Sequence, residues 1–130
     1  MSAVANAKSA GSTFTGKIET LEVTYDFAAD GGASGALDLL TASADVMVRV
    51  TGKVKTGVTS AGAATLEVGK SGATASAIAQ VAKTAADAAG EILQPAGWMY
   101  LASGDKLIQT IGTAALTAGK ITYLVECVKF

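Results

Sequence analysis

The side chains that most often perform chemistry in proteins are scarce in this sequence. It contains no histidine, which removes the commonest general base, the commonest metal ligand and any serine-type catalytic triad. Its single cysteine, Cys127, has no imidazole to activate it and no second thiol for a disulfide within the chain. Zinc sites built from Cys and His are excluded for the same reason. We therefore expect Cys127 to be a buried, unreactive thiol.

The eleven acidic residues offer the remaining route to catalysis or to cation binding. Glu19, Glu22 and Asp26 sit on a predicted strand, where a solvated surface is the simplest interpretation. Asp30 and Asp38 could bind calcium in principle, but no loop around them shows the regular oxygen-ligand spacing. The sequence therefore predicts a protein that is not an enzyme and that has no metal or cofactor.

A glycine-lysine-serine stretch needs comparison with the phosphate-binding loop. Gly69, Lys70 and Ser71 match the second half of GxxxxGK[ST]. The first glycine of that motif would fall at position 64, where the chain has Ala64, and the intervening TLEV reads as a strand. We interpret the segment as a turn that follows a strand.

Alternating hydrophobic residues predict strands along most of the chain. The clearest runs are KIETLEVTYDF from Lys17, DVMVRVTGKVKTG from Asp45 and ITYLVECVKF from Ile121. Shorter runs, separated by turn residues, are ALDLLTA, ATLEVG, EILQ, WMYLA and KLIQTIG. Seven or eight short strands at a spacing of about ten residues are typical of an all-β fold, and we predict a jelly-roll-like β-sandwich.

One segment follows helical rather than strand spacing. In TASAIAQVAKTAADAAG, Ile78 and Val81 fall on one helical face, Thr74 can cap the start and Gly90 fits the stop. The rest of that face is alanine, so the helix would contribute little burial. We predict one short Ala-rich helix or loop over residues 74–89.

The two ends of the chain differ in composition. Residues 1–16 are small and polar, which predicts an extended N-terminal arm ahead of a single β-sandwich domain over residues 17–130. In the arm we expect partner contacts at Ser2, Val4 and Lys8. The final run has apolar residues on both faces, so we expect a strand in the middle of a sheet or in an interface between chains. The residues are Ile121, Tyr123 and Val125 on one face, and Leu124, Val128 and Phe130 on the other.

The composition of the chain limits which kinds of partner it can bind. Half of the residues are hydrophobic, but alanine supplies 27 of them and there are only three Phe, three Tyr and one Trp. Alanine buries little apolar area, so we expect a homo-oligomer that completes its burial between copies. A net charge of −1 with scattered basic residues argues against nucleic acid, and no apolar run is long enough for a membrane helix. No secretory signal is visible, which predicts synthesis in the cytoplasm without export.

The only tryptophan lies in PAGWMY, next to a turn. Clustered large residues at such a place either plug one end of a core or anchor a contact with another chain. We therefore take Trp98, Met99 and Tyr100 as candidate interface residues.

The layout from Asp45 to Phe130 resembles a known kind of protein. It runs DVMVRVTGKV, ATLEVG, a small-residue stretch to AAGEIL, and then ASGDKLIQTIGTAALTAGKITYLVECV. The last block, a strand, an Ala-Leu-Thr-Ala-Gly-Lys turn and a final strand rich in Val, is similar to the C-terminal half of small virion proteins of tailed bacteriophages. The resemblance covers about two thirds of the chain.

This resemblance implies a structural role in the virion. The expected function is that of a capsid decoration (cement) protein, made in the host cytoplasm, that binds the outer surface of the head and stabilises contacts between major capsid subunits. It would act as a homo-oligomer, with a trimer as the expected number. A head-fibre or tail-associated protein is the alternative within this class. From another class, a carbohydrate-binding β-sandwich module would use Trp98 and Tyr100 as a stacking platform.

Overall fold

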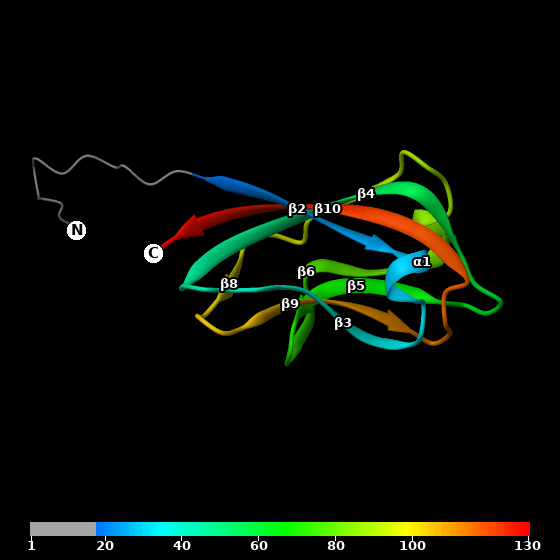
Figure 1. The fold of residues 1–130 in the computed structure, drawn as a ribbon, viewed down its shortest axis with the longest axis horizontal. Coiled ribbons are helices and arrows are strands. Elements are labelled where there is room, and N and C mark those ends of the chain that lie inside the picture. Colours follow the sequence, from blue (N-terminus) through cyan, green and yellow to red (C-terminus); the bar gives the residue numbers. More distant parts are fainter. Residues whose placement is uncertain (1–17) are drawn as a thin grey trace, which may run out of the picture.

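Antiparallel strands account for most of the chain. The computed structural model describes residues 18–130, so the predicted arm, with Ser2, Val4 and Lys8, lies outside the described residues. Two sheets pack face to face (Figure 1), which confirms the all-β sandwich. The strands are β2 (Glu19–Asp26), β3 (Gly35–Thr41), β4 (Val46–Thr59), β5 (Thr65–Lys70), β6 (Ala73–Ala82), β7 (Ile92–Leu93), β8 (Met99–Leu101), β9 (Lys106–Gly112) and β10 (Ala118–Lys129). Residues 18–130 also contain two single turns of helix, α1 (Phe27–Asp30) and the 3₁₀ helix η2 (Lys83–Ala86).

The order of the strands is that of a jelly roll. One sheet has the order β2-β10-β4, with β7 and β8 both pairing with β4, and the other has the order β3-β9-β5-β6. The pairs β5–β6, β4–β7/β8, β3–β9 and β2–β10 are nested one inside the next along the chain. A long hairpin rolled up in this way gives a double-sheet jelly roll, as the sequence predicts.

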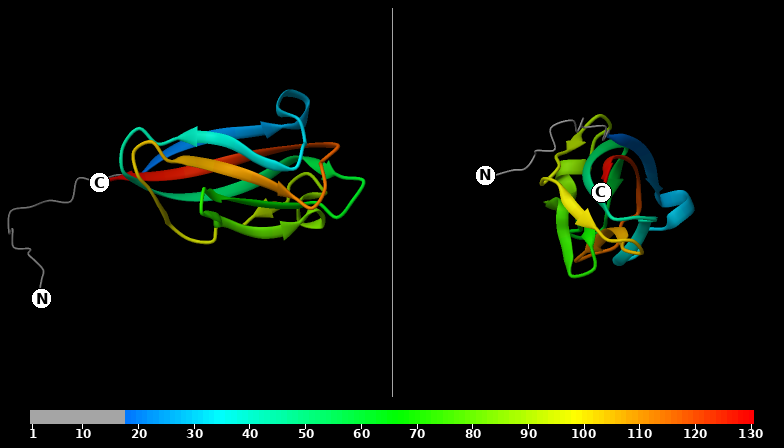
Figure 2. Two further views of the ribbon diagram at one scale, coloured as in Figure 1. Left: turned by 90° about the horizontal axis from the view of Figure 1, so that it is seen from below. Right: turned by 90° about the vertical axis from the view of Figure 1, so that its left-hand side faces the viewer.

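The final strand lies in the middle of the five-stranded sheet. β10 pairs with β2 on one side and with β4 on the other (Figures 1 and 2), so both of its backbone edges are hydrogen-bonded. Gly52 of β4 lies opposite Tyr123, and a Cβ there would come within 3.2 Å of the Tyr123 ring and 3.1 Å of Leu93. The absence of a side chain at Gly52 therefore makes room for the largest residue of β10. The prediction of a central strand is confirmed.

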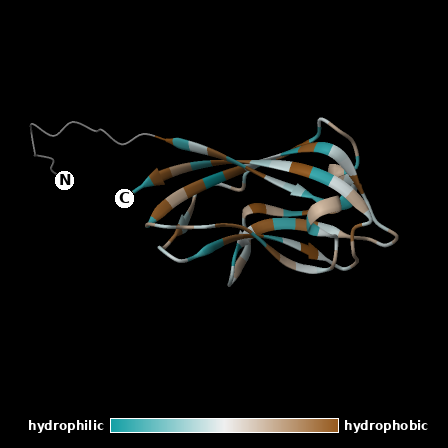
Figure 3. Cartoon of the chain, in the orientation of Figure 1, coloured by the Kyte–Doolittle hydropathy of each residue, from teal (hydrophilic) through white to brown (hydrophobic). Residues whose placement is uncertain are grey.

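The core lies between the inner faces of the two sheets. Residues of alternating hydropathy along β4 and β10 (Figure 3) place one side of each strand in the core and the other side outside. One polar side chain, Gln109 of β9, is fully buried among the described residues, and its Oε1 accepts a hydrogen bond from the Tyr123 hydroxyl. The largest fully buried apolar and aromatic side chains are Tyr25, Tyr123, Leu66, Ile78, Leu101, Leu107 and Ile121.

The predicted Ala-rich helix or loop over residues 74–89 is wrong for most of its length. Residues 73–82 form β6, which pairs with β5, and only Lys83–Ala86 turn as a 3₁₀ helix. The register of β6 against β5 is irregular in two places, since Ala73–Ile78 lie against Val68–Lys70 and Ile78–Val81 against Leu66–Val68. The first irregularity is a bulge that spans Ala77, and both Ala77 and Ile78 are buried in the core. The bulge removes the period-two pattern, and β6 is the strand that the sequence prediction missed.

Candidate interaction face

One outer surface of the sandwich is unusually apolar. Seven large hydrophobic side chains are exposed among residues 18–130, and most lie on the side of the five-stranded sheet that faces away from the core. We call this side the apolar face and define it by Met47, Ile92, Trp98, Tyr100, Leu124, Val128 and Phe130. Leu21 is exposed near the start of β2, but it lies on the same side of the strand as the buried Tyr25, so it is not part of the apolar face.

Strand register brings these residues together. Met47 of β4 lies opposite Tyr100 of β8 on one side and opposite Val128 of β10 on the other. Residues directly opposite in neighbouring strands point to the same side of a sheet and touch one another. The three side chains therefore form a continuous apolar row across three strands.

An ion pair stacked on the tryptophan crosses the centre of the apolar face. Arg49 and Glu126 are opposite each other on β4 and β10, and both Nε and Nη2 of Arg49 lie 2.8 Å from Oε1 of Glu126. The Arg49 guanidinium carbon also lies 5.3 Å from the centroid of the Trp98 ring, within cation–π range. The Arg49–Glu126 charges at the centre of this surface therefore neutralise each other and are fixed in place, while Glu22, Lys53 and Lys55 add further charge on the same side.

The second aromatic residue is also held by neighbours. The Tyr100 ring packs against Phe130 with 5.9 Å between ring centroids and 58° between planes, and Lys70 Nζ lies 5.5 Å from the Tyr100 centroid. Desolvation, with Asp45 and Asp105 nearby, raises the pKa of Tyr100 above its ordinary value, so the hydroxyl is neutral at physiological pH. Arg49 and Phe130 thus contact ring surface that a stacked sugar would need, which weakens the carbohydrate-binding alternative.

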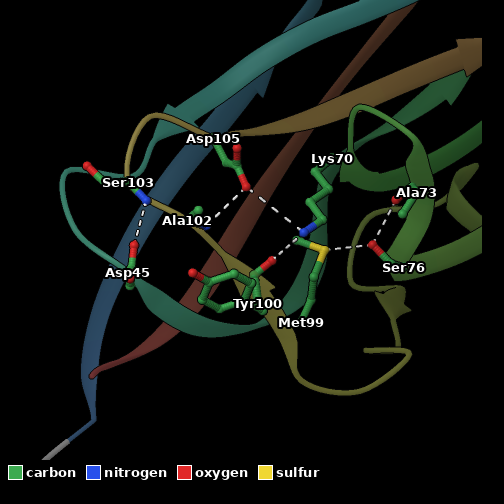
Figure 4. A network of polar contacts seen from close by, with 9 residues as sticks. All are labelled: Asp45, Lys70, Ala73, Ser76, Met99, Tyr100, Ala102, Ser103 and Asp105. Atoms are coloured by element: carbon green, nitrogen blue, oxygen red, sulfur yellow. Dashed lines mark hydrogen bonds and ion pairs between the residues drawn. The ribbon is translucent and has the colours of Figure 1, made fainter.

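A polar network fixes the segment that carries Trp98 and Tyr100. Lys70 Nζ, from β5 of the other sheet, donates to the backbone oxygen of Tyr100 at 2.8 Å and lies 4.0 Å from Asp105 Oδ2 (Figure 4). Asp105 also accepts from the backbone N–H of Ala102 at 3.0 Å, and Asp45 accepts from the N–H of Ser103 at 2.9 Å. β8 is therefore tied to both sheets, and its exposed aromatic side chains sit on a fixed backbone.

The three candidate residues of PAGWMY divide between the two expected roles. Trp98 and Tyr100 are about two-fifths exposed, whereas Met99 is only 6% exposed and packs in the core, where its sulfur contacts the Ser76 hydroxyl. Met99 is the plug, and the two aromatic residues are the parts that another chain could contact. The sequence did not single out Ile92 or Met47. Ile92 lies in a two-residue strand, and Met47 lies on the outward side of β4 between polar residues. Only the pairing of β7, β8 and β10 with β4 puts them on the same side as Trp98 and Tyr100.

The other chemical candidates have structural roles. Lys70 begins the two-residue turn at Ser71 and Gly72 that joins β5 to β6, and no phosphate-binding loop surrounds it. Cys127 is buried, and desolvation together with Glu19, opposed by Lys129, raises the pKa of its thiol, which keeps it protonated. Within residues 18–130 no three His, Cys, Asp or Glu side chains gather where a metal ion could bind.

The outer face of the four-stranded sheet is polar by contrast. A depression of about 540 Å³ there is lined by two aspartates and two lysines. These charges pair with one another, since Lys106 Nζ lies 3.0 Å from Asp38 Oδ2 and Lys70 is engaged by Asp105. In the described part of the chain no helix is long and apolar enough to span a membrane.

Comparisons with known proteins find chains of similar fold. The sequence matches no family profile and no curated protein. A chain in the capsid structure of Helicobacter pylori bacteriophage KHP30 superposes with a TM-score of 0.62 at 16% identity, over 85% of this chain and 86% of that one. A chain in the capsid asymmetric unit of cyanophage Pam1 gives 0.63 at 17% identity, over 92% and 90%. A chain from Bacillus endospore appendages, described as disulfide-linked pili, reaches only 0.42 at 20% identity, over 92% and 95%.

Proposed function

We propose that this protein is a non-enzymatic structural component of a phage virion, and specifically a capsid decoration (cement) protein. The observation that carries the proposal is the jelly-roll fold shared along nearly the whole chain with chains of two phage capsid structures. Jelly rolls also serve lectins and enzymes, so the fold alone does not select a role. The apolar face and the structural use of the reactive side chains favour assembly over catalysis.

The proposed partners are further copies of the chain and a major capsid protein. On the outer surface of the head, each copy would stabilise contacts between neighbouring major capsid subunits by burying modest apolar area at their junction. Summed over the many symmetric copies of a shell, small contributions raise the stress that the shell withstands. A homo-oligomer is part of this proposal, and the number of copies, three by the expectation from sequence, is open to direct measurement.

A binding assay tests the proposal. The purified protein is mixed with heads assembled from the major capsid protein of the same genome, and the heads are sedimented and then heated. We expect saturable co-sedimentation and a higher temperature of head disruption. Heads that neither retain the protein nor gain stability would refute the decoration role. Labelling of intact virions separates the head-fibre or tail alternative, because the label would then lie away from the head shell.

The arm is proposed to make the capsid contact. Residues 1–16 are small and polar, a composition suited to lying extended on a neighbouring subunit. Deletion of residues 1–13, which removes Ser2, Val4 and Lys8, is expected to reduce co-sedimentation with heads and to leave the melting temperature of the sandwich unchanged. Undiminished binding by the deleted protein would eliminate the arm as the attachment segment.

A further inference from the structure

We infer that the apolar face binds the apolar face of a second copy of this chain, so that the protein is a two-fold symmetric dimer. This inference rests on the homo-oligomer part of the proposed function and names its interface. It does not depend on attachment to a capsid. Three observations support it: the gathering of exposed apolar side chains on one face, the size of that face, and the placement of its charges.

The distribution of apolar side chains selects the face. Ile92, Trp98, Tyr100, Leu124 and Phe130 are each 39% to 80% exposed, and all belong to the outer side of the five-stranded sheet. Ile18, 52% exposed, lies one residue before β2 in phase with the outward-facing Thr20. Contiguous apolar surface of this kind on a soluble protein marks a site where another molecule binds. The exposed face of the other sheet offers aspartates and lysines.

The size of the face fits a second copy of the chain. The sheet is four strand positions wide and its central strands, β4 and β10, have 14 and 12 residues. Strand spacing of about 4.8 Å and a rise of about 3.3 Å per residue give an area on the order of 800 Å². A standard stable interface buries about that much on each partner. One sheet face packed on one sheet face therefore suffices.

The charges at the centre of the face, Arg49 and Glu126, are self-complementary. Consider a two-fold axis that runs parallel to the strands, midway between β4 and β10 and between the two copies. The rotation lays β4 of one copy over β10 of the other at the same height, so Arg49 of each copy faces the partner's Glu126. The two Arg49 and two Glu126 side chains then alternate around the axis, so each positive charge has negative neighbours. This favours the paired arrangement over one in which the two copies are shifted along the strands.

The same rotation matches the apolar rows. Met47 of one copy lies over the partner's Val128, and Leu124 lies over the partner's Thr51, because these residues are opposite each other in the β4–β10 register. Tyr100, at the β8 side, comes over the start of the partner's β2, where Ile18 is exposed. The end of the face near Phe130 is thus covered by apolar or uncharged side chains, whereas Lys53 and Lys55 lie toward its other end.

The geometry sets the number of copies. An interface in which the same surface is used on both sides closes at two and leaves no further apolar face exposed. We therefore expect twice the 12.8 kDa chain mass in solution, in place of the trimer predicted from sequence.

Two face variants and one matched control test this interface. Sedimentation equilibrium over a concentration series measures the dimer dissociation constant of the wild type, Leu124→Lys, Tyr100→Glu and Ala79→Lys. Ala79 is an exposed small residue of β6 in the other sheet, so Ala79→Lys adds the same charge elsewhere. We expect Leu124→Lys and Tyr100→Glu to raise the dissociation constant about tenfold or more, and Ala79→Lys to leave it unchanged. Circular dichroism melts confirm that each variant is folded.

A charge swap tests the proposed register. Arg49→Glu alone places four carboxylates together in the paired arrangement and should abolish the dimer. The double variant Arg49→Glu with Glu126→Arg restores alternating charge and should recover most of the association, which a loss of folding would not do. A wild-type monomer at all concentrations, a trimer, or equal weakening by Ala79→Lys would overturn the inference.

Failure of this inference and failure of the proposed function are distinguishable. A dimer that does not sediment with heads leaves the interface intact and removes the decoration role. A monomer that sediments with heads supports the decoration role and removes the dimer interface.

Discussion

The two sheets present equivalent inner faces and opposite outer faces. Inside, both supply fully buried aliphatic or aromatic side chains, such as Val50 and Tyr123 from one and Leu66 and Leu107 from the other. Outside, both sheets carry ion pairs, such as Lys120–Asp26 on one and Lys106–Asp38 on the other. Among the described residues, however, the exposed tryptophan, tyrosine, leucine and phenylalanine side chains all belong to the five-stranded side, and none lies on the four-stranded sheet. The inner faces therefore stabilise the jelly roll, and the outer faces differ in the apolar surface that we propose as an interface.

The largest expected effects test the equivalence of the inner faces. Leu107→Ala in β9 and Ile121→Ala in β10 each remove a fully buried side chain. Each should lower the free energy of unfolding by about 2–5 kcal/mol. Leu124→Ala and Lys106→Ala, on the two outer faces, should each change it by less than about 0.5 kcal/mol when the protein is dilute enough to be monomeric. Urea denaturation measures the free energy of unfolding of all four variants. A small loss at either Leu107 or Ile121 would mean that the two inner faces do not contribute equally to stability.

The next prediction concerns a fully buried hydrogen bond between the two inner faces. The Tyr123 hydroxyl donates to Gln109 Oε1, and the Nε2 of Gln109 has no partner in the described residues. Tyr123→Phe leaves the whole amide buried without a hydrogen bond, so it should cost about 1–3 kcal/mol. The double variant Tyr123→Phe with Gln109→Leu should recover most of that loss. A double variant less stable than Tyr123→Phe alone in urea denaturation would contradict this account.

Alkaline pH should weaken the five-stranded sheet first. All three tyrosines lie in it, and burial raises the pKa of Tyr123 well above the ordinary 10.0. The pKa of Tyr25 is also raised, by desolvation and by Asp30 and Asp26. The folded state therefore keeps protons that the unfolded chain has lost.

Because the folded state binds more protons than the unfolded chain above pH 10.0, the free energy of unfolding falls as the pH rises there. The contribution is fully present below pH 10.0 and is lost as the pH rises from there toward the folded pKa, at about 1.4 kcal/mol per pH unit for each strongly shifted group. Urea denaturation between pH 8 and 11 should show this fall, and Tyr123→Phe should show a shallower one. Equal slopes for the two proteins would rule out Tyr123 as the main source.

The smallest expected effects compare the ion pairs of the two outer faces. Side-chain exposures are 41% and 22% for Arg49 and Glu126, against 53% and 57% for Lys106 and Asp38. Arg49 also makes two contacts to one carboxylate and stacks on Trp98. Double-mutant cycles in urea should give a coupling of about 0.5–1 kcal/mol for the Arg49 pair and less than about 0.5 for the Lys106 pair. A larger coupling energy for the Lys106–Asp38 pair would mean that lower exposure and stacking on Trp98 do not strengthen the Arg49–Glu126 ion pair.

Much of the fold could be predicted because most strands have a clear alternating pattern. β2, β4 and β10 are covered on one side by the core, so their apolar residues recur every second position and the strands are visible in the sequence. β6 was missed because its bulge sets Ala77 beside Ile78 and breaks that period, while its alanines fit helical spacing equally well. Pairing with β5 overrides the helical preference of those alanines.

The candidate site was predictable only in part. Trp98 and Tyr100 were visible as clustered aromatic residues beside a turn, and Leu124 and Phe130 as a second apolar side of the last strand. Nothing in the sequence shows that these two groups share one surface, because that depends on β8 and β10 both pairing with β4. Register, which is a property of the folded sheet, creates the apolar face.

The nested order of strand pairs also bears on how the chain finds its fold. β5 and β6 are joined by a two-residue turn, whereas β10 pairs with β2 through residues such as Thr24 and Thr122, which are 98 positions apart. Closing that outermost loop first would carry a large entropic penalty. Each inner strand pair, once formed, shortens the loop that must close to form the next pair. Folding is therefore expected to propagate outward from the β5–β6 hairpin. The seating of β10 would then be a late and slow event in reaching the native state.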